Sequence, residues 1–192
     1  MLDTYKFIEK YKRISIIGME KNVGKTTLLN KLIADIGTNK KLGLTSIGRD
    51  GEDIDVVTNT DKPRIYVRRG SIIATGRNCL AKCDITKEIL YVTDFTTPMG
   101  SIVIVRALSD GYVDIAGPSY NKQVKIVVEL MEKFGSEISI VDGALGRKST
   151  AISDVSEATI LSTGAALSLD MLKVVEETKK TVYFLKLDEV EK

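Results

Sequence analysis

Residues 18–27 read GMEKNVGKTT, which places two glycines, a lysine and two threonines in the order typical of a phosphate-binding loop. In such a loop, backbone N–H groups surround the phosphates, the lysine reaches the terminal phosphates and a threonine hydroxyl binds Mg²⁺. The common pattern is GxxxxGK(S/T). Here five residues, Met19 to Val23, separate Gly18 from Gly24. We therefore expect a phosphate loop with one extra residue.

The segments on either side have the patterns that such a loop requires. Residues 14–17 are mostly apolar and β-branched, which predicts a strand ending at Gly18. Residues 26–36 repeat apolar side chains at helical spacing, which predicts a helix beginning near Lys25. The N-terminus of that helix offers free N–H groups and a partial positive charge. The alternative is a threonine that caps an ordinary helix after a glycine turn.

The loop gives each residue an expected role. Lys25 is expected to reach the terminal phosphates, and the hydroxyl of Thr26 to bind Mg²⁺. The backbone from Asn22 to Thr27 is expected to surround the β-phosphate. The residues assigned to nucleotide binding are Gly18, Glu20, Lys21, Asn22, Val23, Gly24, Lys25, Thr26 and Thr27.

Composition limits the classes of function. The chain has 192 residues, of which 43% are hydrophobic, so it can bury one substantial core, and we expect a single domain over residues 1–192. A formal charge of +2 without a dense basic run argues against nucleic acid and anionic membranes as partners. No apolar run approaches the roughly 20 residues of a membrane span, which favours a soluble cytoplasmic protein.

The absence of histidine excludes several kinds of site. Serine and cysteine triads of the common sort use histidine, and the usual zinc sites need more ligands than Cys79 and Cys83 supply. If the CxxxC segment is helical, one turn separates the two thiols. Two buried cysteines on an apolar face explain this spacing more simply than a metal or corrinoid-like ligand completed by a partner.

Strands that alternate with helices predict an α/β fold, with a doubly wound, mostly parallel sheet. An inserted β-rich segment at about 55–118 interrupts the alternation, with short runs RIYV, SIIAT, SIVIV and YVDIA and one expected helix at 82–92. Outside it, we expect strands at 42–47, 138–141, 158–161 and 182–185, and helices at 121–134 and 169–179.

In its pattern of a glycine, five residues and GKT, the chain resembles dethiobiotin synthetase and the cobyrinic acid a,c-diamide synthases. These enzymes belong to the signal-recognition, MinD and biotin-synthesis class of P-loop NTPases. Residues 140–146, IVDGALG, are similar to the strand and (E/D)GAxG motif at the second metal site of those enzymes. The resemblance implies ATP and Mg²⁺ as ligands, with Asp142 as a magnesium ligand. The alternative for Asp142 is an ordinary Asp-Gly turn. Residues 158–168, ATILSTGAALS, resemble the strand and glycine-containing loop that follow in those families.

The chain departs from that class in several positions. The class often carries an extra lysine five residues before the invariant one, where this chain has Glu20, and Lys21 comes one residue late. The substrate-binding lysine motif of dethiobiotin synthetase is replaced by SIGRDGED. In this acidic segment we expect Asp50 to be a metal-linked catalytic acid, and a solvated acidic turn is the alternative.

The nucleotide base is indicated only weakly. Guanine-specific relatives carry (N/T)KxD after a late strand, and this chain has LKLD, with Lys186 and Asp188 correctly spaced but Leu185 in place of the polar residue. We therefore expect ATP and keep GTP open.

Three segments are similar to P-loop proteins that accompany B12-dependent lysine and ornithine aminomutases and are thought to be reactivating ATPases. These segments are KPRIYVRRG, TTPMGSIVIVRALSDG and VDIAGPS. The resemblance implies a B12-dependent aminomutase or a second reactivating subunit as partner, in a homo- or heterodimer.

We consider three functions: a magnesium-dependent ATPase that acts as a switch or reactivating factor, an ATP-dependent ligase acting on a small carboxylate or amine, and a GTP-using or non-hydrolysing nucleotide-binding module. The switch is preferred, because the sequence offers no convincing second polar pocket for a ligase.

Overall fold

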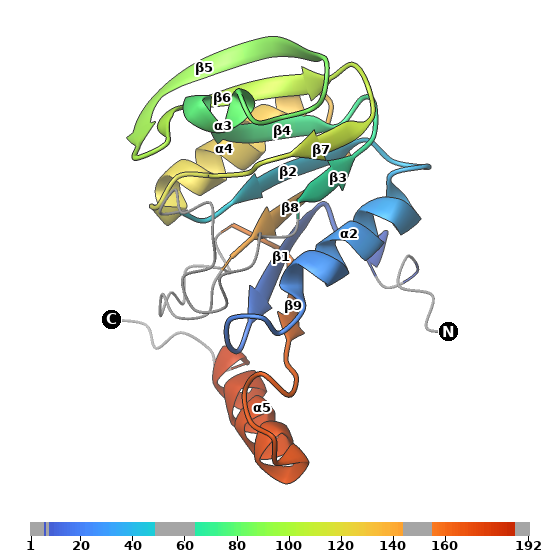
Figure 1. Ribbon diagram of the computed structural model, residues 1–192, viewed down its shortest axis with the longest axis vertical. Coiled ribbons are helices and arrows are strands. Elements are labelled where there is room, and N and C mark those ends of the chain that lie inside the picture. Colours follow the sequence, from blue (N-terminus) through green and yellow to red (C-terminus); the bar gives the residue numbers. More distant parts are fainter. Residues whose placement is uncertain (1–5, 7, 49–63, 144–154, 187–192) are drawn as a thin grey trace.

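The protein has an α/β fold built on a large, mostly parallel sheet (Figure 1). The computed structural model describes residues 6, 8–48, 64–143 and 155–186. Within these residues, seven strands form one sheet in the order β5-β6-β4-β2-β8-β1-β9. The strands are β1 (Arg13–Gly18), β2 (Leu42–Ser46), β4 (Ile72–Gly76), β5 (Lys87–Thr97), β6 (Gly100–Ala107), β8 (Ile138–Asp142) and β9 (Ala158–Ser162). From β4 to β9 all neighbouring strands are parallel, whereas β6 runs antiparallel to both of its neighbours, β4 and β5.

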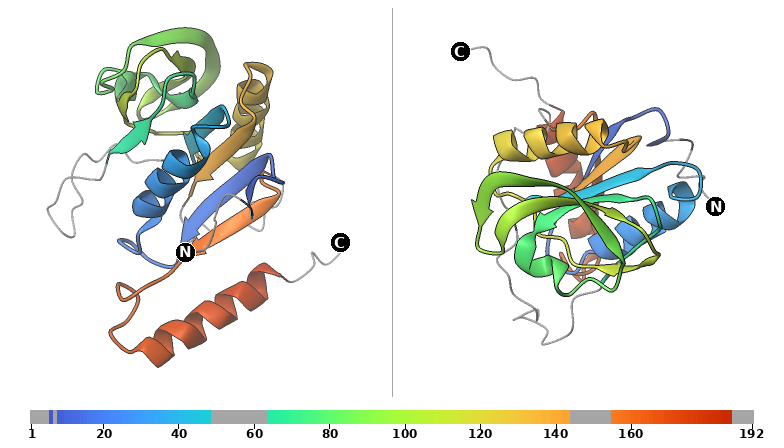
Figure 2. Two further views of the ribbon diagram at one scale, coloured as in Figure 1. Left: turned by 90° about the vertical axis from the view of Figure 1, so that its right-hand side faces the viewer. Right: turned by 90° about the horizontal axis from the view of Figure 1, so that it is seen from above.

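Helices lie on both faces of this sheet (Figure 2). On one face is α2 (Lys25–Ile36), and on the other is α4 (Asn121–Lys133). The remaining elements are the short helix α3 (Arg77–Leu80), the C-terminal helix α5 (Met171–Leu185), and the strands β3 (Ile65–Val67) and β7 (Gly111–Val113), which form a small antiparallel sheet. The predicted α/β fold with a mostly parallel sheet is confirmed.

Side-chain alternation along the strands explains the two layers, because successive residues of a strand point to opposite faces. Ile14 and Ile16 of β1 join Leu32 and other apolar residues of α2 in one buried cluster. On β4, Ile73 belongs to this cluster, whereas its neighbour Ile72 packs with the residues of α4 in a second one. Both faces of the central strands are thus buried, as expected for parallel strands.

The segment after residue 64 extends this sheet and then returns to its parallel part. Strands β4, β6 and β5 widen the sheet at one edge. The chain then reaches the carboxyl end of β2, where the N–H of Gly117 donates to Ser46 Oγ at 2.9 Å and that of Gly48 to Pro118 O at 3.0 Å. A Cβ atom on Gly117 would lie 1.8 Å from Ser46 O, so the close approach requires glycine.

The expected elements around the loop agree closely with the structure. The strands expected at 14–17, 42–47, 138–141 and 158–161 correspond to β1, β2, β8 and β9, and the helices at 26–36 and 121–134 to α2 and α4. Their ends differ by at most one residue. Residues 49–63 and 144–154 lie outside the described part, and Asp50 is among them.

The helix expected at 82–92 is wrong, because most of that segment belongs to β5. Only α3, four residues long, is helical nearby. Strand β5 pairs with β6 from Lys87↔Ala107 to Thr97↔Gly100, with two irregularities in the register. The backbone hydrogen bonds that β6 offers outweigh the weak helical spacing of the segment.

The strand expected at 182–185 is also wrong, because α5 continues through Leu185. Its N-cap Asp170 accepts a hydrogen bond from Leu172 N at 2.9 Å, and Lys180 pairs with Glu176 at 3.0 Å one turn away. No glycine or proline interrupts the helix. Consequently Lys186 follows a helix and not a strand, and Asp188 lies outside the described residues.

Among the described residues, no helix has both the length and the apolar character needed to cross a membrane.

Candidate functional site

The candidate site lies at the carboxyl ends of the three central strands. Strand β1 ends at Gly18, and its neighbour β8 ends at Asp142. The register pairs Asp142 with Ile16 of β1 on one side and with Ser46 of β2 on the other. In open α/β sheets, ligands bind outside this end of the strands. The loop between β1 and α2 is therefore in the expected position for a ligand.

The loop itself contains two residues in the left-handed backbone conformation. Asn22 has φ 59° and Gly24 has φ 85°. Asparagine tolerates this region better than most residues, and glycine adopts it without strain. A left-handed residue followed by a helical one turns successive N–H groups to the same side, and Gly24 followed by Lys25 has this arrangement. The loop is thus shaped for an anion.

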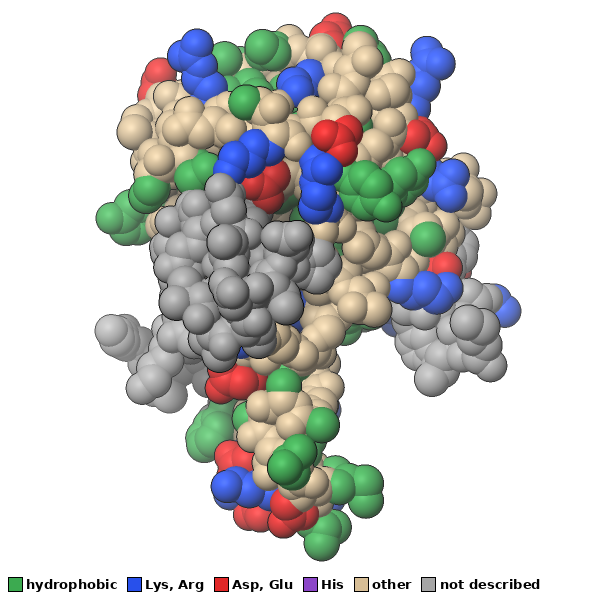
Figure 3. Space-filling view, in the orientation of Figure 1, with side chains coloured by type: hydrophobic (Ala, Val, Ile, Leu, Met, Phe, Trp, Pro, Cys, Tyr) green, Lys and Arg blue, Asp and Glu red, His purple; other side chains and the backbone are tan. Residues whose placement is uncertain are grey.

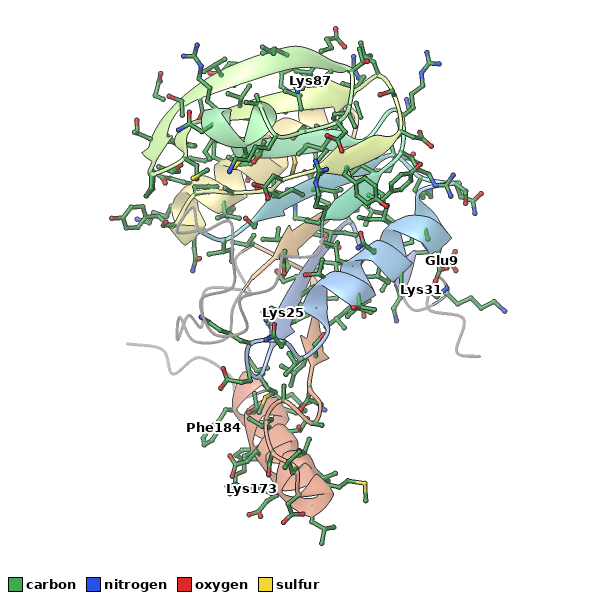
Figure 4. All side chains as sticks on the ribbon, in the orientation of Figure 1. Glu9, Lys25, Lys31, Lys87, Lys173 and Phe184 are labelled. Carbon is green, nitrogen blue, oxygen red and sulfur yellow. The ribbon has the colours of Figure 1, made fainter. Side chains whose placement is uncertain are left out.

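The side chain of Lys25 is turned back over the loop (Figure 4). Its Nζ donates a hydrogen bond to the carbonyl oxygen of Glu20 at 3.2 Å. Gly18 makes room for this arrangement, because a Cβ atom there would lie 2.7 Å from Lys25 Nζ and 2.7 Å from Val23 Cγ2. A side chain at position 18 would displace the lysine. The spacing of glycine and lysine therefore has a direct steric reason.

The N-terminus of α2 has no side-chain cap. The N-cap residue is Gly24, which has no side chain to cap the helix, and the first turn contains no acidic residue. Thr26 and Thr27 lie within the first turn and not at the N-cap position, so the alternative of a threonine cap is wrong. The first-turn N–H groups and the partial positive charge of the helix end are available to an anion.

Asp142 is the acidic residue that the sheet brings next to this loop. It is partly buried, and Ile47 N donates to its carbonyl oxygen at 2.8 Å. The next residue, Gly143, donates its N–H to Ile16 O at 2.9 Å. The backbone at the end of β8 is therefore held between β1 and β2, which fixes the position from which the carboxylate extends.

The donor set fits magnesium held together with phosphate. Among the described residues, no group of three or more His, Cys, Asp and Glu side chains could hold a metal ion. Mg²⁺ in phosphate sites commonly takes one or two protein ligands and fills its remaining positions with phosphate oxygens and water. Thr26, half-buried in the first turn, and Asp142 are the residues that would supply these ligands.

The other predicted loop residues have different surroundings. Val23 is buried beside Gly18, so its side chain supports the loop by packing. Glu20, Lys21 and Asn22 are exposed, and Glu20 Oε1 accepts from Lys21 N at 2.9 Å. For Glu20, the carbonyl oxygen and not the carboxylate contacts Lys25.

One neighbour of the loop was not assigned as a site residue from the sequence. Ser162, at the end of β9, pairs with Gly18 in the sheet, and its carbonyl oxygen accepts from Met19 N at 2.9 Å. The chain after β9 therefore begins beside the start of the loop between β1 and α2. The signal for this position was the STG run that follows an apolar strand.

The two cysteines differ in burial. Cys79 is buried in α3, whereas Cys83 is half-buried beyond the end of that helix. The Cys83 thiol donates to Cys79 O at 3.3 Å, and burial raises the pKa of Cys83. The expected pair of buried cysteines on one helical face is thus confirmed for Cys79 only.

No protein-family model, curated protein or solved structure matches this chain.

Proposed function

We propose that the chain is a magnesium-dependent, ATP-binding P-loop NTPase that hydrolyses ATP as a switch or reactivating factor for a partner protein. The observation that carries this proposal is Lys25, whose Nζ lies 3.2 Å from Glu20 O above the loop that enters an uncapped helix. A lysine amine and free helical N–H groups directed at one place are the elements that bind a phosphate group.

In the proposed complex, phosphate oxygens replace the Glu20 carbonyl as the acceptor of Lys25. The exchange is favourable because a charged acceptor makes a stronger hydrogen bond with an ammonium group than a neutral carbonyl does. Gly18 leaves the space in which the amine can move. Lys25 then neutralises negative charge on the terminal phosphates, which increases during transfer of the phosphoryl group.

Thr26 and Asp142 would hold Mg²⁺, and the resemblance adds Asp50 to them. When bound, the metal ion supplies charge neutralisation at the phosphate oxygens and polarises the transferred group. The role of this chain's residues is to fix its position. The backbone around Asp142 is clamped on both sides in the sheet, which suits that role.

ATP is preferred over GTP. The guanine motif of the relatives follows a strand, whereas Lys186 follows helix α5. The main support for GTP has therefore been removed, and ATP is retained from the resemblance to the synthetases.

The carboxyl end of β2 supports a switch over a ligase. A ligase needs polar side chains beside the terminal phosphate to hold a small carboxylate or amine. Thr45 Oγ1 donates to Ala74 O at 3.0 Å, and Ser46 Oγ accepts from Gly117 N at 2.9 Å. Both hydroxyls are buried, and that of Thr45 bonds to strand β4, whereas that of Ser46 bonds to the segment after β7. A switch requires no such pocket, because it acts through its grip on a partner. The resemblance implies that this partner is a B12-dependent aminomutase or a second reactivating subunit.

Calorimetric titration with ATP and Mg²⁺ tests the proposal. Lys25→Ala should weaken ATP binding by roughly ten- to 150-fold, the equivalent of about 1.5–3 kcal/mol for a hydrogen bond to a charged group. Lys125→Ala is the matched control, because it removes the same charge from an exposed position of α4, away from the loop. Equal affinity of Lys25→Ala and the parent chain would refute the phosphate-loop assignment, and GTP in place of ATP tests the base.

A further inference from the structure

Strand β5 forms one edge of the seven-stranded sheet (Figure 1). In the described part of the chain it pairs only with β6, so the backbone N–H and C=O groups on its outer side can pair with another strand. The strand is eleven residues long, and three of its large hydrophobic side chains are exposed: Ile89 at 63%, Val92 at 53% and Tyr91 at 46%. Hydrophobic side chains are visible at this edge in Figure 3. A long apolar edge is a template for pairing with a further strand.

The pairing with β6 shows which face of the sheet each side chain of β5 occupies, because residues paired across two strands share a face. Alternate residues of β6 from Val103 to Ala107 belong to the buried cluster on the α2 face. Their partners on β5 are Val92, Ile89 and Lys87. These three side chains therefore lie on the α2 face.

The α4 face carries the residues between them. Tyr91 pairs with Ile104, which belongs to the cluster on the α4 face, and Leu90 packs against the same cluster. Leu90 and Tyr91 are consecutive and still share a face, because the register between β5 and β6 is irregular there. Glu88 lies on this face as well, since its partner Arg106 neighbours two residues of the α2 face.

The order of faces from position 87 to position 94 is the same in both directions. Phe95 packs against the cluster on the α4 face, three residues after Val92 on the α2 face. Regular alternation between them places Thr93 on the α4 face and Asp94 on the α2 face. Positions 87, 89, 92 and 94 thus lie on one face, and positions 88, 90, 91 and 93 on the other. The irregularity lies at the centre of this pattern.

Such a pattern is complementary to a second copy of itself in antiparallel orientation. When position 90 of one copy lies opposite position 91 of the other, every side chain meets one on its own face. Ile89 then lies opposite Val92 of the partner subunit, and Leu90 opposite Tyr91 of the partner subunit. Each contact occurs twice. The side chains that are exposed in the single chain therefore cover one another.

The charges at the two ends favour the same register. Lys87 lies opposite Asp94 of the partner subunit, and opposite charges across two strands stabilise their pairing. Asp94 is exposed and takes part in no ion pair within the described residues. The ammonium group of Lys87 donates to Leu80 O at 2.6 Å and has further protons to donate. Glu88 keeps Arg106 of its own chain as its partner at 2.6 Å.

We propose that β5 pairs antiparallel with β5 of a second copy of this chain, centred between Leu90 and Tyr91, so that two sheets join in a two-fold symmetric dimer. A two-fold interface must be self-complementary, and the order of faces and charges meets that condition. An irregular register usually protects an edge by bending it away from other strands. Here it lies on the two-fold axis, so both strands bend at the same place. Because one strand of each subunit makes the contact, we expect the dimer to dissociate on dilution.

Sedimentation of the full chain over a range of concentrations tests the dimer. The parent chain should pass from monomer to dimer as its concentration rises. Ile89→Lys should raise the dissociation constant at least about tenfold, because it places a charge within the apolar contact. Ile126→Lys is the matched control: Ile126 is 43% exposed on α4, and this variant should dimerise like the parent chain. Thermal unfolding of each variant verifies that the fold persists.

Two charge variants test the register. Asp94→Lys and Lys87→Glu each place like charges opposite one another, so each variant alone should dimerise more weakly than the parent chain. An equimolar mixture of the two should dimerise more tightly than either alone, because opposite charges then meet at both ends of the contact. This comparison also controls for any effect of Lys87→Glu on the contact with Leu80.

Several outcomes would overturn the proposal. A chain that is monomeric at every concentration does so, as does a dimer that Ile89→Lys leaves unchanged. A mixture of the charge variants no tighter than either alone rejects the register. Assembly beyond the dimer would mean that the edge pairs with a different surface. A monomer in which β5 gains hydrogen-exchange protection only when an aminomutase is added would assign the edge to that protein instead.

Discussion

At the residue scale, the unusual spacing of the loop is accommodated by its backbone. Five residues separate Gly18 from Gly24, and one of them, Asn22, takes the left-handed conformation at φ 59°. The extra length brings the carbonyl of Glu20 under the amine of Lys25. The lysine is thus held over the loop before any ligand arrives, which reduces the ordering that binding requires.

Asp142→Asn tests the proposed metal ligand. The amide keeps the shape of the side chain but loses the charge that Mg²⁺ prefers. We expect ATP to bind still, with a smaller dependence on Mg²⁺ and with hydrolysis reduced at least about tenfold. The measurements are ATP affinity with and without Mg²⁺, and phosphate release.

The stability of the variant is the control, since Asp142 lies at the end of a central strand. Its thermal unfolding should stay close to that of the parent chain. Unchanged turnover and an unchanged response to Mg²⁺ would show that Asp142 serves only as a turn residue after β8.

Part of the site was predictable because residue type and backbone demand coincide there. Position 24 has a positive φ and position 18 has no room for a side chain, so both favour glycine. Lys25 directly follows Gly24. The contact of Lys25 with the Glu20 carbonyl was not predictable, because any residue carries a carbonyl. The place of Ser162 beside the loop depends on β9 pairing with β1, which is a tertiary contact that spacing does not encode.

At the element scale, α5 shows where local patterns fail. The run from Val182 to Leu185 is short, apolar and aromatic, and such runs are compatible with a buried strand or with a helix. The choice depends on what lies next to the run. The cap at Asp170 and an uninterrupted helical segment favour the helix.

Amide hydrogen exchange tests the exposed state of α5. No residue of this helix is buried, so its amides should exchange through local opening, far faster than those of β1 and β8. Protection in β1 serves as the internal reference and should stay constant.

Protection in α5 equal to that in β1 would contradict this picture, because it would place the helix firmly on its own chain.

At the scale of the whole molecule, the loop between β1 and α2 is joined to α5 by a short path. Strand β9 ends beside the loop, where Met19 N donates to Ser162 O, and residues 163–170 lead from there to α5. Thr163 in this connection contacts Thr178 of the helix. A nucleotide that moves the start of the loop would act on the same connection. A switch needs an element of this kind, on which nucleotide and partner both act.

Phosphate release from the purified chain separates the switch from the ligase. A switch should hydrolyse ATP slowly by itself, because its site is completed only when a partner orders it. A B12-dependent aminomutase should then accelerate release, whereas a panel of small carboxylic and amino acids should have no effect. Lys25→Ala measured in parallel corrects for contaminating ATPases. If a small metabolite stimulates release and added protein does not, the ligase becomes the better assignment. In that case the carboxyl end of β2 would have to open into a substrate pocket, and the hydrogen bonds of Thr45 and Ser46 to Ala74 and Gly117 would have to break.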